Sequence, residues 1–169
     1  DGFYHIWKHN VSTKEVKQIT QGKFVITSFE GFDKKGDNIY YKSTEVSPLE
    51  RHFYKHNLKN GKKVKISKEH GTHSVMPSAS GKYFIDVYSS TDVARRVDLM
   101  DSNGKYIKCL HESVDPLKEY NIGTIELGTL EAEDGQTLYT RMIKPYNFDK
   151  SKKYPVIIYV YGGPHAQMI

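Results

Sequence analysis

The residues best placed to support chemistry are Tyr161, Gly162, Gly163 and Pro164, at the end of the apolar run Val156–Tyr161. Two adjacent glycines let a backbone turn sharply and come close to a substrate, and a proline stiffens the residues after it. A buried strand of an α/β sheet delivers its next loop to the carboxyl edge, where ligands and reacting groups gather. An ordinary strand-ending turn would explain the same residues, so both interpretations stay open at this point.

Metal, cofactor and disulfide chemistry are not predicted. Cys109 is the single cysteine, so no disulfide can form within the chain and no cysteine pair has zinc-ligand spacing. Two histidine pairs, His5 with His9 and His52 with His56, lack a nearby set of carboxylates or thiols. We therefore expect neither a metal nor a cofactor.

The net charge of +5 and the pI near 9.1 first suggest a nucleic-acid partner. However, the lysines are spread along the chain, whereas phosphate recognition gathers basic residues on one element. We expect solvated faces and no nucleic-acid partner; a nucleic-acid-binding β protein, whose affinity would fall steeply with salt, is the weakest alternative. No apolar run reaches the length of a membrane span, and the first ten residues do not form a signal peptide.

A repeat organises the first two thirds of the chain. His-Ile-Trp-Lys-His-Asn begins at residue 5 and His-Phe-Tyr-Lys-His-Asn at residue 52, a displacement of 47 positions. Each copy leads into a turn and a second short strand, and a weaker third copy begins at Arg96 and turns at Asp101–Gly104.

Further short strands precede the second and third copies; they are predicted at 24–29, 38–43, 74–79 and 83–89. Four short strands per unit, repeated about every forty residues, are typical of β-propeller blades. We predict two complete blades and the last two strands of another within residues 1–112. So few blades cannot close a ring, so this stretch is expected to belong to a larger propeller. A β-sandwich with accidental internal similarity is the alternative.

The pattern changes after the propeller segment. Residues 113–124 show no alternation and contain Asp115-Pro116, which indicates a linker. Two longer strands are predicted at 125–133 and 136–143, joined by a two-residue turn at Asp134-Gly135. The unbroken apolar run Val156–Tyr161 indicates a strand buried on both faces. We predict that residues 125–169 begin an α/β domain, so that the chain is mainly β overall.

The order of these elements resembles the prolyl oligopeptidase clan of serine peptidases, most closely its dipeptidyl peptidase IV branch. The resemblance covers essentially the whole chain, and its most specific portion is residues 139–167, with "NFDKSKKYP" followed by "VYGGPHAQ". It implies the C-terminal blades of a propeller joined to the first strands of an α/β-hydrolase domain. It also implies a Ser-His-Asp triad and a peptide substrate held between the two domains.

By this resemblance, Tyr161 matches the tyrosine whose hydroxyl helps to form the oxyanion hole. Gly162 and Gly163 would keep bulk away from the scissile bond, and Pro164 would fix the loop. His165 is not assigned as the catalytic base, because the triad histidine of the family lies near the far end of the hydrolase domain.

No serine in the sequence has glycine two positions before it, so the Gly-x-Ser-x-Gly nucleophile elbow is absent. We expect an inactive fragment of a peptidase that releases Xaa-Pro or Xaa-Ala dipeptides from a free N-terminus. Another peptidase of the clan, such as an oligopeptidase or acylaminoacyl peptidase, and a noncatalytic propeller binding module remain alternatives. By resemblance alone, the parent is expected outside the cytoplasm, as a periplasmic, secreted or membrane-anchored protein, with homodimerisation left open.

Overall fold

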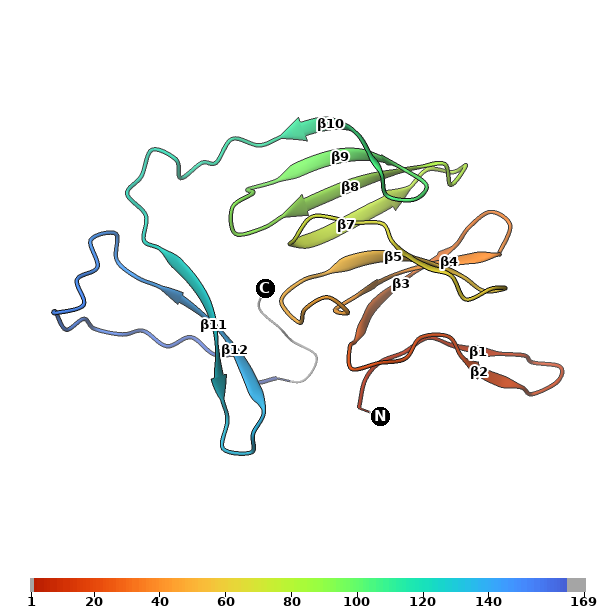
Figure 1. The fold of residues 1–169 in the computed structure, drawn as a ribbon, viewed down its shortest axis with the longest axis horizontal. Coiled ribbons are helices and arrows are strands. Elements are labelled where there is room, and N and C mark those ends of the chain that lie inside the picture. The colour runs from red at the N-terminus through yellow and green to blue at the C-terminus, as the bar shows by residue number, and fades with distance from the viewer. Residues whose placement is uncertain (1, 164–169) are drawn as a thin grey trace. The chain divides into compact units, whose positions relative to one another are not determined.

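The computed structural model describes residues 2–163, and every regular element in that range is a β-strand (Figure 1). The chain divides into two compact units, Asp1–Val114 and Asp115–Ile169. Within residues 2–163 there is no helix with the length and apolar character needed to span a membrane.

Two four-stranded antiparallel sheets form most of the first unit. In each sheet every strand pairs with the next one along the chain, so both are simple meanders. The first sheet consists of β3 (Ile26–Phe32), β4 (Asn38–Ser43), β5 (His52–Asn57) and β6 (Lys63–Lys65). The second consists of β7 (Thr72–Pro77), β8 (Tyr83–Ser89), β9 (Arg96–Asp101) and β10 (Tyr106–Glu112). The prediction of two complete four-stranded units is confirmed.

A separate two-stranded sheet precedes them. β1 (Trp7–His9) pairs antiparallel with β2 (Val16–Gln18), as expected for the last two strands of a preceding unit. Beside these strands, Ile6 and Ile19 pack against a buried layer on the next sheet. The buried members of that layer are Ile39, Tyr41 and Tyr54.

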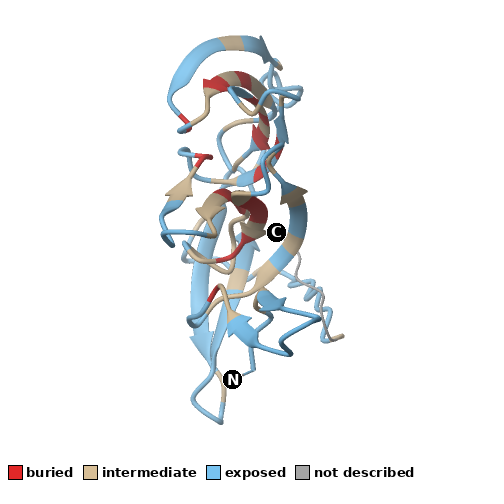
Figure 2. Ribbon diagram, turned by 90° about the vertical axis from the view of Figure 1, so that its right-hand side faces the viewer, coloured by how far each residue is buried: buried red, intermediate tan, exposed pale blue. Residues whose placement is uncertain are grey.

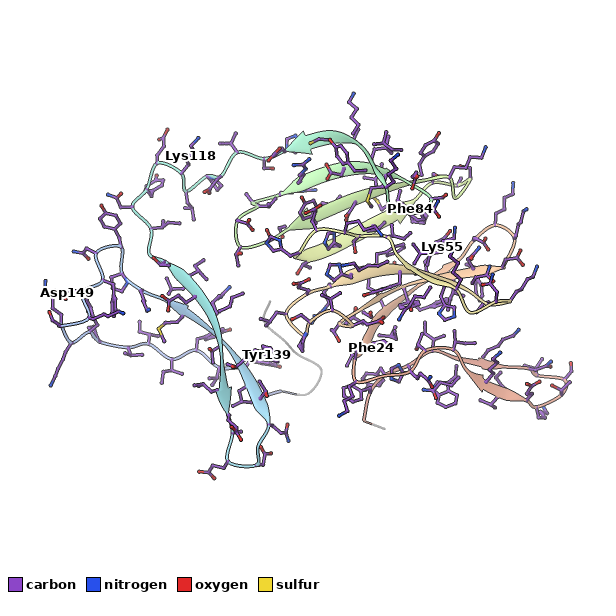
Figure 3. The ribbon with its side chains drawn as sticks, in the orientation of Figure 1. Phe24, Lys55, Phe84, Lys118, Tyr139 and Asp149 are labelled. Atoms are coloured by element: carbon purple, nitrogen blue, oxygen red, sulfur yellow. The ribbon has the colours of Figure 1, made fainter. Side chains whose placement is uncertain are left out.

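Buried aromatic side chains join the two four-stranded sheets. The rings of Tyr40 and Phe53 on the first sheet stack with centroids 5.7 Å apart. Phe84 on the second sheet meets both of them edge-on, at 5.7 and 5.9 Å (Figure 3). Aromatic contacts of this kind contribute about 0.5–1.5 kcal/mol each beyond the area they bury. Figure 2 shows that the buried residues follow these two sheets.

The repeated sequence produces repeated turns. After β5, the side-chain oxygen of Asn57 accepts from the amides of Lys59 and Asn60, and Gly61 takes a φ of +71°. Asn10 makes the same arrangement after β1, where the corresponding left-handed residue is Lys14, with φ of +61°. The left-handed region of φ favours glycine, but here a lysine occupies it. Lys14 therefore shows that the turn keeps its geometry even without a glycine.

In the second unit, β11 (Ile125–Glu131) pairs along its whole length with β12 (Thr137–Ile143). The predicted two-residue turn between them is wrong. Ala132 donates its N–H to the Gln136 carbonyl at 2.8 Å, and Gly135 donates to the Ala132 carbonyl at 2.9 Å with a φ of +79°. The loop therefore has three residues and ends in a left-handed glycine, a geometry that Asp-Gly also fits.

The apolar run Val156–Tyr161 forms no strand, against the prediction. Its side chains are exposed, and Ile157 is 96% exposed. A strand buried on both faces needs a hydrogen-bonded neighbour at each edge. Within residues 115–163, β11 and β12 pair only with each other, so the run has no partner strand. The assignment of residues 125–169 to an α/β-hydrolase domain, and the predicted boundaries 1–112 and 113–124, stay predictions.

Candidate functional site

Tyr161 lies in an extended segment without regular structure, and its side chain is 62% exposed. Among residues 2–163, no residue forms a hydrogen bond with its hydroxyl. The phenolic O–H therefore remains available to an external acceptor. A phenol is a neutral donor, so it can meet a negatively charged oxygen without carrying a full charge into the site.

Gly163 has a specific relation to this ring. A Cβ atom at Gly163 would lie 2.8 Å from Cε1 of Tyr161 and 2.9 Å from both Cζ and Oη, closer than real Cβ contacts. A Cβ at Gly162 would meet nothing within 4 Å. Neither glycine has a left-handed φ. A side chain at Gly163 would therefore require the exposed tyrosine ring to shift.

The other two residues of interest in this loop cannot be placed. Pro164, predicted to fix the loop, and His165, not assigned as a base, both lie outside the described residues. Their predicted roles are therefore unchanged by the structure.

A compact loop after β12 precedes the segment that leads to Tyr161. The rings of Phe148 and Tyr154 stack at 5.2 Å. The Tyr154 hydroxyl accepts from the amide of Asp149, which Figure 3 labels, at 2.9 Å. Lys144 lies over the Phe148 ring and forms an ion pair of 2.6 Å with Glu126 on β11. These contacts tie the loop to the hairpin, so the residues "NFDKSKKY" form a defined structure of their own.

Titratable side chains in the first unit form a second group, which the sequence patterns missed. His52 and His73 come from different sheets, and their rings stack at 5.0 Å while both are almost fully buried. Asp86 is buried beside His73, with oxygen atoms 2.8 and 3.0 Å from Nδ1. His73 shares the buried face of β7 with Val75, and Asp86 shares the buried face of β8 with Phe84.

Among residues 2–163, no cluster of three or more histidine, cysteine, aspartate or glutamate side chains could hold a metal ion. His52 is flanked by Glu50 and Ser67, and His73 by Asp86 and the Glu69 carbonyl. These partners satisfy both ring nitrogens of each histidine, so neither ring has a nitrogen free to act as a ligand.

Comparison with known proteins decides the family. The model of the dipeptidyl peptidase IV N-terminal region matches residues 1–95, more than half of the chain. The chain belongs to this family. Its first unit is therefore part of a β-propeller, and the predicted mainly-β fold with propeller blades is confirmed, as is the resemblance to the dipeptidyl peptidase IV branch.

Several relatives of the dipeptidyl peptidase IV family match almost the whole chain. A probable dipeptidyl peptidase 4 of Neosartorya fischeri is 30% identical over 99% of the chain and 23% of the relative. Mouse dipeptidyl peptidase 8 is 29% identical over 92% of the chain and 19% of its own length.

Two solved structures have the same fold. A putative dipeptidyl aminopeptidase IV of Bacteroides ovatus shares 36% identity with a TM-score of 0.80, over 96% of this chain and 24% of that one. Dipeptidyl peptidase 4 of Porphyromonas gingivalis shares 31% identity with a TM-score of 0.81, over 92% of this chain and 22% of that one. The chain thus spans about a fifth to a quarter of the dipeptidyl peptidase IV relatives it matches.

Proposed function

We propose that this chain is part of a serine exopeptidase that releases Xaa-Pro or Xaa-Ala dipeptides from the free N-terminus of a peptide. The names of its relatives, which are dipeptidyl peptidases, support a peptidase. The observation that carries the site is Tyr161, an exposed phenol in the "VYGGP" loop with no hydrogen-bond partner among residues 2–163.

In the proposed reaction, a serine oxygen outside this sequence attacks the peptide carbonyl carbon, and a histidine takes the serine proton. The carbonyl oxygen then becomes an oxyanion. Tyr161 donates its O–H to this oxyanion, and a backbone N–H beside the nucleophile is the second donor. The histidine next gives its proton to the leaving amine as the C–N bond breaks, which leaves an acyl-enzyme for water to hydrolyse.

The contribution of Tyr161 should be large because its donor is in place before charge develops. Removing one such donor typically costs about 2.7–4 kcal/mol of transition-state stabilisation. The substrate carbonyl carries little charge in the ground state, so the same hydrogen bond adds little to substrate affinity. Tyr161 should therefore affect turnover much more than binding.

The direct test is Tyr161→Phe in the full-length protein, with a chromogenic Xaa-Pro substrate. We expect kcat to fall about 100- to 1,000-fold with KM nearly unchanged. Tyr159→Phe, which removes another exposed hydroxyl two residues earlier, is the matched control and should retain kcat. An unchanged kcat in Tyr161→Phe would remove this residue from the mechanism.

A separate test concerns the chain by itself. Because it contains no Gly-x-Ser-x-Gly elbow, the 169-residue chain should hydrolyse none of these substrates. Activity in a homogeneous preparation that a serine-directed inhibitor abolishes would contradict this proposal, since it would require a nucleophile within these residues.

A further inference from the structure

The junction between the two four-stranded sheets contains a buried column of three rings. His52 on β5 stacks on His73 on β7 with centroids 5.0 Å apart and planes inclined by 29°. On its other face His73 stacks on Tyr88 of β8, again at 5.0 Å. β5 and β7 run side by side at this junction, where Arg51 forms a bridge with Thr72 (Figure 1). The His52–His73 contact therefore links two blades.

The hydrogen bonds of His73 assign its protons. Its Nε2 lies 2.8 Å from the Glu69 carbonyl oxygen, which can only accept, so Nε2 carries a proton. Its Nδ1 lies 2.8 and 3.0 Å from the two carboxylate oxygens of Asp86, which also accept. With an ionised Asp86, both nitrogens donate, and this geometry fits an imidazolium paired with the carboxylate.

His52 has the opposite arrangement. Its Nε2 donates to the Glu50 carboxylate at 2.5 Å. Its Nδ1 lies 3.0 Å from the Ser67 hydroxyl, and that hydroxyl already accepts from the Phe53 amide at 2.9 Å. Ser67 can then donate its own proton to Nδ1, and every group is satisfied when His52 is neutral. The column thus places a neutral imidazole against a charged one.

We propose that the His52–His73 stack makes the junction between the β3–β6 and β7–β10 sheets sensitive to pH, and that protonation of His52 loosens it. A second proton on His52 places two buried cations with ring centres 5.0 Å apart. It also puts an N–H at Nδ1, so Ser67 must turn its proton away from the ring. Both changes disfavour the packed junction relative to an opened one in which water reaches His52.

Some of the charges around the column favour protonation of His52, and others disfavour it. Beside His52, the Glu50 carboxylate favours a second proton on the His52 ring. Lys65 on β6 and His73 both disfavour that proton. Beside His73, Asp86 on β8 and the Glu69 carbonyl hold the existing charge. Beyond Tyr88, Arg96 and Asp98 on β9 form an ion pair of 3.0 Å that adds no net charge. The Glu69 carboxylate also acts on Tyr88, whose pKa is raised mainly by burial.

The direction of the pH effect follows from His52. Burial, the largest cause, lowers the pKa of His52 below its ordinary value of 6.5, while the Glu50 hydrogen bond partly offsets this. The opened junction then binds more protons than the closed one below about pH 6.5. The opening constant is therefore flat above this pH and rises as the pH falls. Its rise is at most about tenfold per pH unit, until the pKa of the closed state is passed.

The test uses amide hydrogen exchange on the full-length protein between pH 7.5 and 5.5, corrected for intrinsic rates. This range lies above the titration of ordinary carboxylates. In the wild type, the opening constant of residues 52–57 and 72–77 should rise several-fold from pH 6.5 to 5.5. His52→Gln keeps a donor and an acceptor but cannot titrate, so its opening constant should stay flat. A flat wild type, or a His52→Gln profile equal to that of the wild type, overturns the proposal.

Two further measurements complete the test. His70→Gln removes an exposed histidine that pairs with Asp92 at 2.8 Å, and it should keep the wild-type profile. Hydrogen exchange at the Cε1 carbon of the His52 ring in the wild type reports the titration of His52 without any substitution. We expect its midpoint below 6.5, and we expect the opening constant to rise between pH 6.5 and that midpoint. A midpoint at or above 6.5 overturns the proposal even if His52→Gln fails to fold.

Discussion

Asp86 and His73 form a buried ion pair between adjacent strands of one propeller blade, with an oxygen atom 2.8 Å from Nδ1. The two residues sit diagonally across the β7–β8 ladder, in which Val75 is opposite Asp86 and His73 is opposite Tyr88. Their side chains are 4% and 0% exposed, so water cannot replace either partner. The pair therefore supports the blade only as long as both members are present.

We expect Asp86→Asn to destabilise the full-length protein strongly. The substitution leaves His73 either as a buried cation without its counterion or as a neutral ring that has lost its charge-assisted hydrogen bond to residue 86. Loss of one member of a buried pair typically costs about 3–5 kcal/mol. Urea unfolding, followed by the change in midpoint at constant slope, measures this cost.

Asp92→Asn is the matched control for Asp86→Asn. Asp92 also faces a histidine, His70, at 2.8 Å, but these side chains are 66% and 57% exposed. Solvent screens such a pair, so its loss should cost at most about 1 kcal/mol. Equal midpoints for the two variants would contradict the view that burial gives the His73 pair its importance.

The blades and most of their turns could be predicted because their signals are local. The Asn57–Gly61 turn requires an acceptor side chain at its start and a left-handed residue at its end, and both can be read from neighbouring positions. The 47-residue repeat then predicts the same turn after Asn10, where Lys14 replaces the glycine.

The contacts between blades and within the final loop could not be predicted in the same way. His52 and His73 meet only because two sheets pack together, and no local pattern distinguishes them from exposed strand histidines. The apolar run Val156–Tyr161 has the composition of a buried strand, but a strand also needs neighbours to pair with. The Gly163 contact with the Tyr161 ring depends on a side-chain orientation that the sequence does not specify.

Gly104 offers a second test of the blade junction. It lies in the β9–β10 turn with a φ of +77°, and a Cβ there would lie 2.2 Å from the Ile66 carbonyl oxygen after β6. Gly104→Ala therefore meets both an unfavourable backbone region and a backbone atom of the neighbouring blade. Together these effects should cost about 2–5 kcal/mol, which urea unfolding of the full-length protein can measure.

Gly36→Ala separates the two contributions at Gly104. Gly36 has a similar φ of +71°, but a Cβ there would meet nothing within 4 Å. This variant should lose only about 1–2 kcal/mol, the cost of the left-handed backbone. If Gly104→Ala were no more destabilising than Gly36→Ala, the close approach of the two blades at Ile66 would be unimportant for stability.

The last prediction concerns the proposed oxyanion donor and rests on the proposed function. Gly163→Ala places a methyl group within 2.9 Å of Oη of Tyr161, so the ring must move. A displacement of about 1 Å at a catalytic group can cost on the order of 100-fold in rate. We expect kcat of the full-length protein to fall about 10- to 100-fold, whereas a methyl group at Gly162 meets nothing within 4 Å and should leave the Tyr161 ring where it is.

A double variant shows whether Gly163 acts through Tyr161. If the alanine methyl group lowers kcat only by moving the phenol, then Gly163→Ala should cost little more once Tyr161→Phe has already removed the hydroxyl. The combined loss should then be close to that of Tyr161→Phe alone. Losses that multiply would mean that Gly163 supports catalysis by another route, such as room for the substrate backbone, and would separate the positioning role of Gly163 from the donor role of Tyr161.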